Sequence, residues 1–321
     1  MIFRIITIVA GSIIMVLTAC NGGKQEETVC RQFPYIEVPL YITDRTEAAG
    51  YATKHFWDNY ITTAKRDTSL LNLDRESFTK AYVEYINLLG AVGNAGADSH
   101  KKIFSFADSL YAAGDKRLLG RLMELSELYL YNPNSPYLNE ELYLPALDAI
   151  LSLKSIDSLH KLQYRYQREL ALLNRTGTKA ANFKYEYIKS LEPQLKKGYS
   201  TLHQTDAEHL LIYFNNPGCA SCKEMQEILT SAPAVSYMIE TGRLKILSMY
   251  IDRDTQSWQE RYLNTPSNWI YARDYTHQLE SNELYGIRAI PSLYLLDKEK
   301  RVILKDATAQ KVVEYFSNRQ N

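Results

Sequence analysis

The hydrophobic pattern of this 321-residue chain changes its period near Gly177. Before that residue, apolar and aromatic side chains recur every three or four positions, which is typical of amphipathic helices. After it, short continuous apolar runs alternate with helical stretches, which is typical of a sheet covered by helices. We therefore predict an α+β multi-domain chain, with an all-α helical domain over residues 46–175 and an α/β domain over residues 177–321.

The first domain is predicted to contain five or six helices joined by short turns. Asp74 is a candidate N-cap for one of them. Three glycines between residues 90 and 96 interrupt the pattern, and Asn132-Pro133-Asn134-Ser135-Pro136 is a stop signal. The expected helices cover residues 46–64, 74–89, 99–113, 115–131, 140–153 and 156–173.

The second domain has the order strand, helix, strand, hairpin and final helix. Strands are expected at residues 183–188, 210–214 and 244–251, with a hairpin of residues 292–296 and 302–304. Helices are expected at residues 219–230 and 310–318. A polar segment with Trp258 and Trp269 precedes the hairpin, and core packing is the simplest interpretation of both rings.

The overall charge is balanced. The chain has 37 Lys and Arg residues against 37 Asp and Glu residues, so its formal net charge is zero. Nucleic-acid binding therefore has no electrostatic support, because a phosphate backbone attracts a basic excess. The 45% hydrophobic content argues for packed cores rather than disorder.

The N-terminus reads as an export signal. Arg4 is followed by an apolar stretch over residues 5–16 that is too short to span a bilayer permanently. Leu17-Thr18-Ala19-Cys20 resembles a bacterial lipobox, which implies a signal peptide over residues 1–19, lipidation of Cys20 and a polar tether over residues 20–45. A plain secretory peptide or an anchor helix is the alternative. We expect a cell-envelope lipoprotein that faces the periplasm, with the membrane leaflet left open.

The cell envelope permits disulfides, so the four cysteines can be assigned. Cys20 is used by the lipid, and Cys219 and Cys222 form one Cys-x-x-Cys pair. Cys30 is a spare thiol or the partner of an unknown cysteine.

The Cys219–Cys222 pair is also half of a possible zinc site, but no second close Cys or His pair accompanies it, and we expect no metal. The pair follows an apolar strand and a Pro217-Gly218 turn, at the start of a predicted helix. Free backbone amides there lower the pKa of a thiol below its usual ~8.5. Cys219 is thus predicted to be the attacking thiolate and Cys222 the resolving thiol. A static structural disulfide is the alternative.

Several motifs carry a resemblance to the TlpA-like branch of the thioredoxin superfamily over residues 177–321. They are Gly177-x-x-Ala180-Ala181-Asn182-Phe183, Leu211-Ile212-Tyr213-Phe214, Cys219-x-x-Cys222 and Ile290-Pro291. The resemblance implies a thioredoxin-like fold in which a cis-Pro291 faces the cysteines and Ile290 pairs with an extended substrate. An ordinary trans proline is the alternative. The helical half resembles a domain of unknown function that precedes TlpA-like modules.

The chain departs from that family pattern at three positions. Gly218 replaces a common tryptophan, and Tyr213 occupies the place of the buried acid of thioredoxin. Glu224 lies two residues after Cys222 rather than three. It is a possible proton relay to Cys222, or a solvated glutamate favourable to the helix dipole.

The leading hypothesis is a thiol:disulfide oxidoreductase that reduces or isomerises disulfides of exported proteins. Its partners would be protein thiols or disulfides and an unknown electron donor. It needs no cofactor beyond the Cys219–Cys222 disulfide. The alternative is a non-enzymatic interaction protein that uses the same fold as a scaffold. A peroxidase has little support. The environment of a peroxidase cysteine, which is a single Cys with a Thr and an Arg around it, is not recognisable in this sequence.

Overall fold

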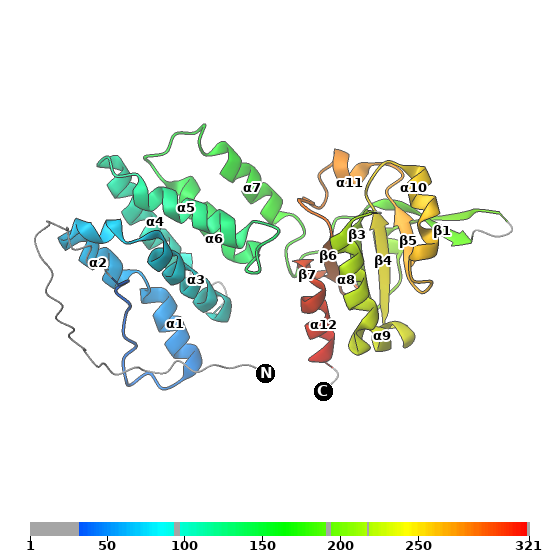
Figure 1. Ribbon diagram of the computed structural model, residues 1–321, viewed down its shortest axis with the longest axis horizontal. Helices are drawn as coiled ribbons and strands as arrows, with labels where there is room; N and C mark the ends of the chain where they lie inside the picture. The colour runs from blue at the N-terminus through cyan, green and yellow to red at the C-terminus, as the bar shows by residue number, and fades with distance from the viewer. Residues whose placement is uncertain (1–31, 93–96, 191–193, 217, 320–321) are drawn as a thin grey trace, which may run out of the picture.

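A computed structural model describes residues 32–92, 97–190, 194–216 and 218–319, which form two bodies placed side by side (Figure 1). One body is all helical, and the other contains a sheet with helices packed on it. Cys20 and Cys30, and the predicted signal peptide, lie outside the described residues. No helix among the described residues is both long and apolar enough to cross a membrane.

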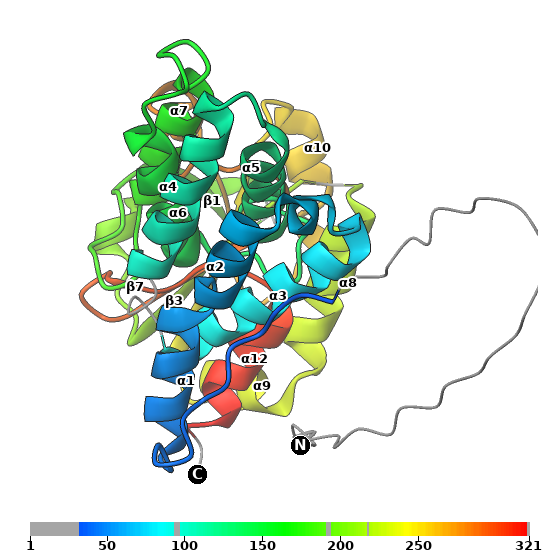
Figure 2. The same ribbon diagram turned by 90° about the vertical axis from the view of Figure 1, so that its left-hand side faces the viewer.

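The helical domain contains seven α-helices within the described residues. They are α1 Arg45–His55, α2 Asp58–Arg66, α3 Arg75–Val92, α4 Ala97–Ala112, α5 Arg117–Leu130, α6 Glu140–Ser152 and α7 Leu162–Leu172. Figure 2 shows them packed as one layered group. Asp74 caps α3 as predicted, since its carboxylate accepts the backbone N–H of Ser77 at 2.8 Å.

Two helix boundaries differ from the prediction. The expected helix over residues 46–64 is broken after α1, and both Phe56 and Trp57 are buried at the break. Neighbouring residues of a straight helix point in different directions, so the bend lets both rings enter one core. The helix α7 begins six residues later than expected, because Asp157 accepts the backbone N–H of His160 in a local turn.

The second domain is built on a seven-stranded sheet of order β2-β1-β5-β4-β3-β6-β7. Its strands are β1 Lys184–Ser190, β2 Lys196–Thr201, β3 His209–Asn215, β4 Leu244–Tyr250, β5 Ile270–Arg273, β6 Ser292–Leu296 and β7 Val302–Ala307. β3 pairs parallel with β4 and antiparallel with β6. The predicted hairpin is confirmed as β6–β7, whereas β2 and β5 were not predicted.

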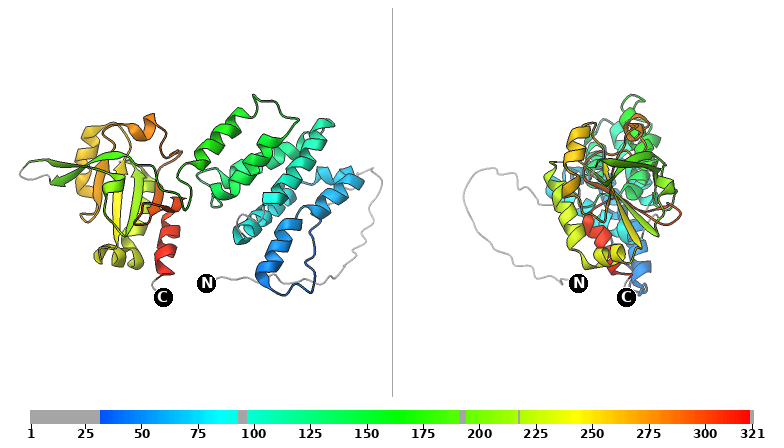
Figure 3. Two further views of the ribbon diagram at one scale, coloured as in Figure 1. Left: turned by 180° about the vertical axis from the view of Figure 1, so that it is seen from behind. Right: turned by 90° about the vertical axis from the view of Figure 1, so that its right-hand side faces the viewer.

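Both faces of the sheet are covered. Helices α8 Ala220–Ser231, α9 Pro233–Glu240 and α12 Ala309–Ser317 pack on one face, where Leu211 and Tyr213 of β3 point. Leu210, Ile212 and Phe214 point to the other face. This alternation places β3 in the middle of the core (Figure 3). The short helices α10 Thr255–Glu260 and α11 Gln278–Ser281 lie in the segments that flank β5.

Trp258 is completely buried and stacks on Tyr271 with ring centroids 5.8 Å apart. Trp269 is 7% exposed and meets Tyr213 edge-on at 5.9 Å. The expectation that both tryptophans serve core packing is confirmed.

Candidate functional site

The cysteine pair lies at the carboxyl end of the central strand β3. Cys219 is the N-cap residue of α8, and it forms a disulfide with Cys222 across a Cα–Cα distance of 5.2 Å. Cys222 is 4% exposed, whereas Cys219 is partly exposed. The second cysteine is thus the more deeply buried of the two, whereas the predicted roles of attacking and resolving thiol stay predictions.

The turn before the pair depends on Gly218. Its φ of +82° lies in the left-handed region, where a residue with a Cβ is strained. A Cβ at this position would also come within 3.6 Å of the Arg261 guanidinium. That distance is an ordinary contact, so the positive φ rather than a lack of space favours glycine at this turn.

The start of α8 points hydrogen-bond donors at the Cys219 sulfur. The backbone N–H of Cys222 lies 3.2 Å from that sulfur, and the Ser221 hydroxyl lies 3.3 Å from it. These donors, together with the positive end of the helix dipole, stabilise negative charge on Cys219 when the disulfide is open. The geometry therefore suits a thiolate nucleophile at position 219.

Tyr213 is hydrogen-bonded to the backbone of the cysteine pair. Its hydroxyl donates to the backbone carbonyl of Cys222 at 2.6 Å, and its side chain is 2% exposed. Burial raises the pKa of this hydroxyl well above its ordinary value. The tyrosine in the place of the family's acid thus fixes the first turn of α8 through a neutral hydrogen bond.

The loop before β6 completes the site. The Ile290–Pro291 peptide bond is cis, as the sequence predicts. Ile290 and Cys219 both pack against the cluster that contains Cys222. Glu224, the suggested proton relay, is exposed on α8 and lines a cavity with Ser221, Ile290 and Pro291. Its predicted role stays a prediction.

A pocket of about 540 Å³ opens beside the disulfide, and Arg261 and Asn264 form its far side. The Gln226 side chain donates to the Asn264 carbonyl at 3.2 Å, which ties this segment to α8. Arg261 places a positive charge near Cys219 and is a functional candidate that the sequence did not reveal. It belongs to a polar segment without a motif.

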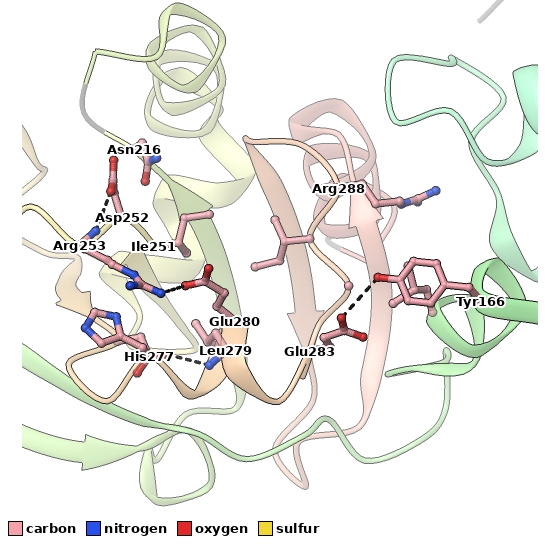
Figure 4. Close-up of a pocket in the computed structure, with 14 residues that line it drawn as sticks. Tyr166, Asn216, Ile251, Asp252, Arg253, His277, Leu279, Glu280, Glu283 and Arg288 are labelled. Atoms are coloured by element: carbon pink, nitrogen blue, oxygen red, sulfur yellow. Dashed lines mark hydrogen bonds and ion pairs between the residues drawn. The ribbon is translucent and has the colours of Figure 1, made fainter. Parts of the chain in front are cut away.

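A separate cavity of about 520 Å³ lies between α7 and the sheet domain (Figure 4). Two side-chain contacts join residues of its lining: Arg253 contacts Glu280 at 2.8 Å, and the Tyr166 hydroxyl lies 3.5 Å from Glu283. The described residues contain no group of three or more His, Cys, Asp or Glu side chains that could hold a metal ion.

A cysteine pair that caps the helix after the central strand, opposite a cis-proline loop, defines a protein of the thioredoxin fold. A thioredoxin-like protein from Bacteroides caccae, known from its crystal structure, is similar to this chain. The two are 34% identical, with 90% of this chain and 99% of that chain covered and a TM-score of 0.79. The chain belongs to this thioredoxin-like family.

Further comparisons concern parts of the chain. Residues 18–174 match a family described as a domain of unknown function, DUF5106. The C-terminal domain of an uncharacterized Bacteroides fragilis protein is 41% identical over 45% of this chain and 98% of its own, with a TM-score of 0.41. Nucleoredoxin of Danio rerio is 26% identical over 121 residues, 37% of this chain; the match covers 28% of the nucleoredoxin's length.

Proposed function

We propose that this chain is a thiol:disulfide oxidoreductase of the bacterial cell envelope, anchored through a lipid on Cys20, that reduces or isomerises disulfides of exported proteins. The observation that carries the proposal is the accessible Cys219 sulfur at the helix N-terminus, bonded to the buried Cys222. The envelope location rests on the lipobox-like Leu17-Thr18-Ala19-Cys20 segment.

The reaction follows from this geometry. In the reduced protein, the Cys219 thiolate attacks one sulfur of a substrate disulfide, whose S–S bond breaks, and the leaving sulfur takes a proton. Cys222, one helical turn away, then loses its proton and attacks the Cys219 sulfur of the mixed disulfide. The substrate leaves as a dithiol, and the Cys219–Cys222 disulfide forms. Two electrons have passed from protein to substrate, and a dithiol donor must return them.

The test compares the two cysteines in the reduced full chain. We expect Cys219 to alkylate faster at pH 7 than a free cysteine in a peptide. Cys219→Ser should lower disulfide reduction by at least about 10³-fold, whereas Cys222→Ser should accumulate a mixed disulfide visible by mass spectrometry. Full activity of Cys219→Ser would instead favour the scaffold alternative. Palmitate labelling that persists in Cys20→Ser would contradict the anchor.

A further inference from the structure

A further cavity, next to the Cys219–Cys222 turn, is formed by both domains. It measures about 290 Å³ and lies between α8, the cis-proline loop and residues 133–138, which connect α5 to α6. We call it the interdomain groove, and residues 133–138 the 133–138 loop. The groove has apolar side chains on both sides: Met225, Ile228 and Ile290 on the sheet domain, and Pro133, Pro136 and Leu138 on the helical domain.

The charges around the groove nearly cancel. Glu224 and Asp306 are negative and Lys311 is positive, and all three contribute to its lining. No strong preference for a charged ligand follows from such a mixture. Met225, Ile228 and Ile290 are only partly buried, so an apolar side chain that enters the groove removes further apolar surface from water.

Local hydrogen bonds stabilise the 133–138 loop. The backbone N–H of Ser135 donates to the Asn132 carbonyl at 2.9 Å, and that of Leu138 donates to the Ser135 carbonyl at 3.1 Å. The Ser135 hydroxyl donates to the Tyr129 carbonyl at 2.6 Å. Two prolines further restrict the backbone. The loop thus presents a preformed surface, and a ligand does not have to order it.

Ion pairs hold this loop against the cis-proline loop. Arg288, two residues before Ile290, lies 2.8 Å from Glu140 and 3.2 Å from Asp306. Its guanidinium also lies 3.9 Å from the centre of the Tyr131 ring. Glu140 comes two residues after the 133–138 loop and is the first residue of α6. The two walls of the groove are therefore fastened to each other through side chains that are largely buried.

We propose that the interdomain groove holds the segment of a substrate polypeptide next to its reactive cysteine, and that the helical domain thereby selects substrates. The substrate class is an extended protein segment with an aliphatic side chain beside the cysteine, because both walls of the groove contribute apolar side chains that such a residue can contact. The groove adjoins the disulfide, since Ser221, whose hydroxyl lies 3.3 Å from the Cys219 sulfur, is one of its lining residues. This inference rests on the proposed oxidoreductase function and adds recognition to it.

The experiment uses three probes with one leaving group. They are 5,5′-dithiobis(2-nitrobenzoate) and two short peptides whose cysteine carries a thionitrobenzoate, flanked by leucine in one peptide and by serine in the other. The reduced full chain should react about tenfold faster with the leucine peptide than with the serine peptide, because one aliphatic side chain is buried. Release of the chromophore gives each rate.

The variant Asn134→Trp adds a large side chain on an exposed residue of the 133–138 loop. It should slow the reaction with the leucine peptide about tenfold and leave the small reagent within twofold of the parent chain. The matched control is Leu159→Trp, which makes the same addition on a side chain 72% exposed, beyond the opposite end of α6. The control should leave all three rates unchanged.

The outcomes separate the two proposals. If the parent chain reacts with none of the three probes faster than a free thiol, the oxidoreductase function fails and this inference fails with it. If the parent chain reacts with all three but shows no preference for leucine, or if Asn134→Trp slows every probe equally, the oxidoreductase function stands and the selection by the helical domain is overturned.

Discussion

The two sides of the cysteine pair differ in how far apart in the sequence their contacting residues lie. On one side, the Cys219–Cys222 turn takes its geometry from residues close in the chain, such as Tyr213 and Gly218. On the other side, the interdomain groove joins segments more than 150 residues apart, as the hydrogen bond from Arg288 to the Tyr131 carbonyl shows. The reactivity of the cysteine pair thus depends on residues near it in the sequence, whereas the proposed substrate groove depends on contacts between distant segments. Mutations at one should therefore leave the other unchanged.

At the domain junction, one residue of the sheet domain contacts both α6 and the end of α7. Lys305 of β7 contacts Glu140 at 2.6 Å, and its ammonium group donates to the Ala171 carbonyl at 2.9 Å and the Leu173 carbonyl. These carbonyls belong to the end of α7, where intrahelical donors run out and a cation is favourable. One lysine therefore holds α6 and α7 to the sheet.

The largest effect on stability is expected at the junction. Glu140→Ala leaves Arg288 and Lys305 without their shared carboxylate, and their side chains are only 14% and 10% exposed. We expect the free energy of unfolding to fall by about 3 kcal/mol, since Asp306 then remains as the one carboxylate beside two largely buried cations. Denaturant unfolding followed by tryptophan fluorescence measures the change.

The neighbouring Glu141 supplies the control for this prediction. It pairs with Arg175, but their side chains are 30% and 37% exposed, so Glu141→Ala should cost about 1 kcal/mol or less. The alkylation rate of reduced Cys219 should be the same in both variants. A changed alkylation rate in Glu140→Ala would break the proposed separation between junction and turn.

A medium effect is expected at the turn. Gly218→Ala forces a side chain into a backbone with φ of +82° and should destabilise the chain by about 1–2 kcal/mol. Gly120→Ala is the matched substitution, in α5, where a Cβ meets nothing within 4 Å. It should stabilise the chain by up to about 1 kcal/mol. Shifts of the same sign in the two unfolding curves would contradict the role of Gly218.

The smallest effect concerns electrostatics at the turn. Arg261→Gln removes a positive charge from the pocket beside Cys219 and should slow alkylation of the reduced thiol by about two- to fivefold at low salt. The difference should shrink in 0.5 M salt, about where screening becomes strong. The control is Arg253→Gln, because Arg253 is exposed and paired with Glu280. This variant should alter the alkylation rate little. Equal slowing by both variants would refute a specific contribution of Arg261 to the reactivity of Cys219.

The features that could be predicted from the sequence are likewise those that depend on residues near one another in the chain. Asp74, the Cys219–Cys222 pair and the β6–β7 hairpin were predicted because caps, helix starts and hairpins depend on neighbouring residues. The strand β5 was missed because it has only four residues and ends at Arg273, which is bonded to the buried Glu186 of β1. That partner is 87 residues away, and no local pattern indicates it.

The site shows this limit most clearly. The sequence predicted the cysteines from their place at a helix start, and the cis-Pro291 through a motif resemblance. It did not predict the contributions of Arg288 and the 133–138 loop, because these arise only where two distinct hydrophobic cores meet. No sequence pattern marks a single arginine before a proline as functional. The same holds for a proline-rich turn between two helices.

The hydrogen bond from Tyr213 to the Cys222 carbonyl has a consequence for the movement of protons. The hydroxyl keeps its proton at neutral pH, because burial raises its pKa, and that proton is already committed to a backbone oxygen. Tyr213 therefore cannot act as the acid or base that charges and discharges the buried sulfur. Proton exchange with the buried sulfur must therefore use another group, and the candidates are the predicted relay Glu224 and water that enters the pocket lined by Arg261 and Asn264.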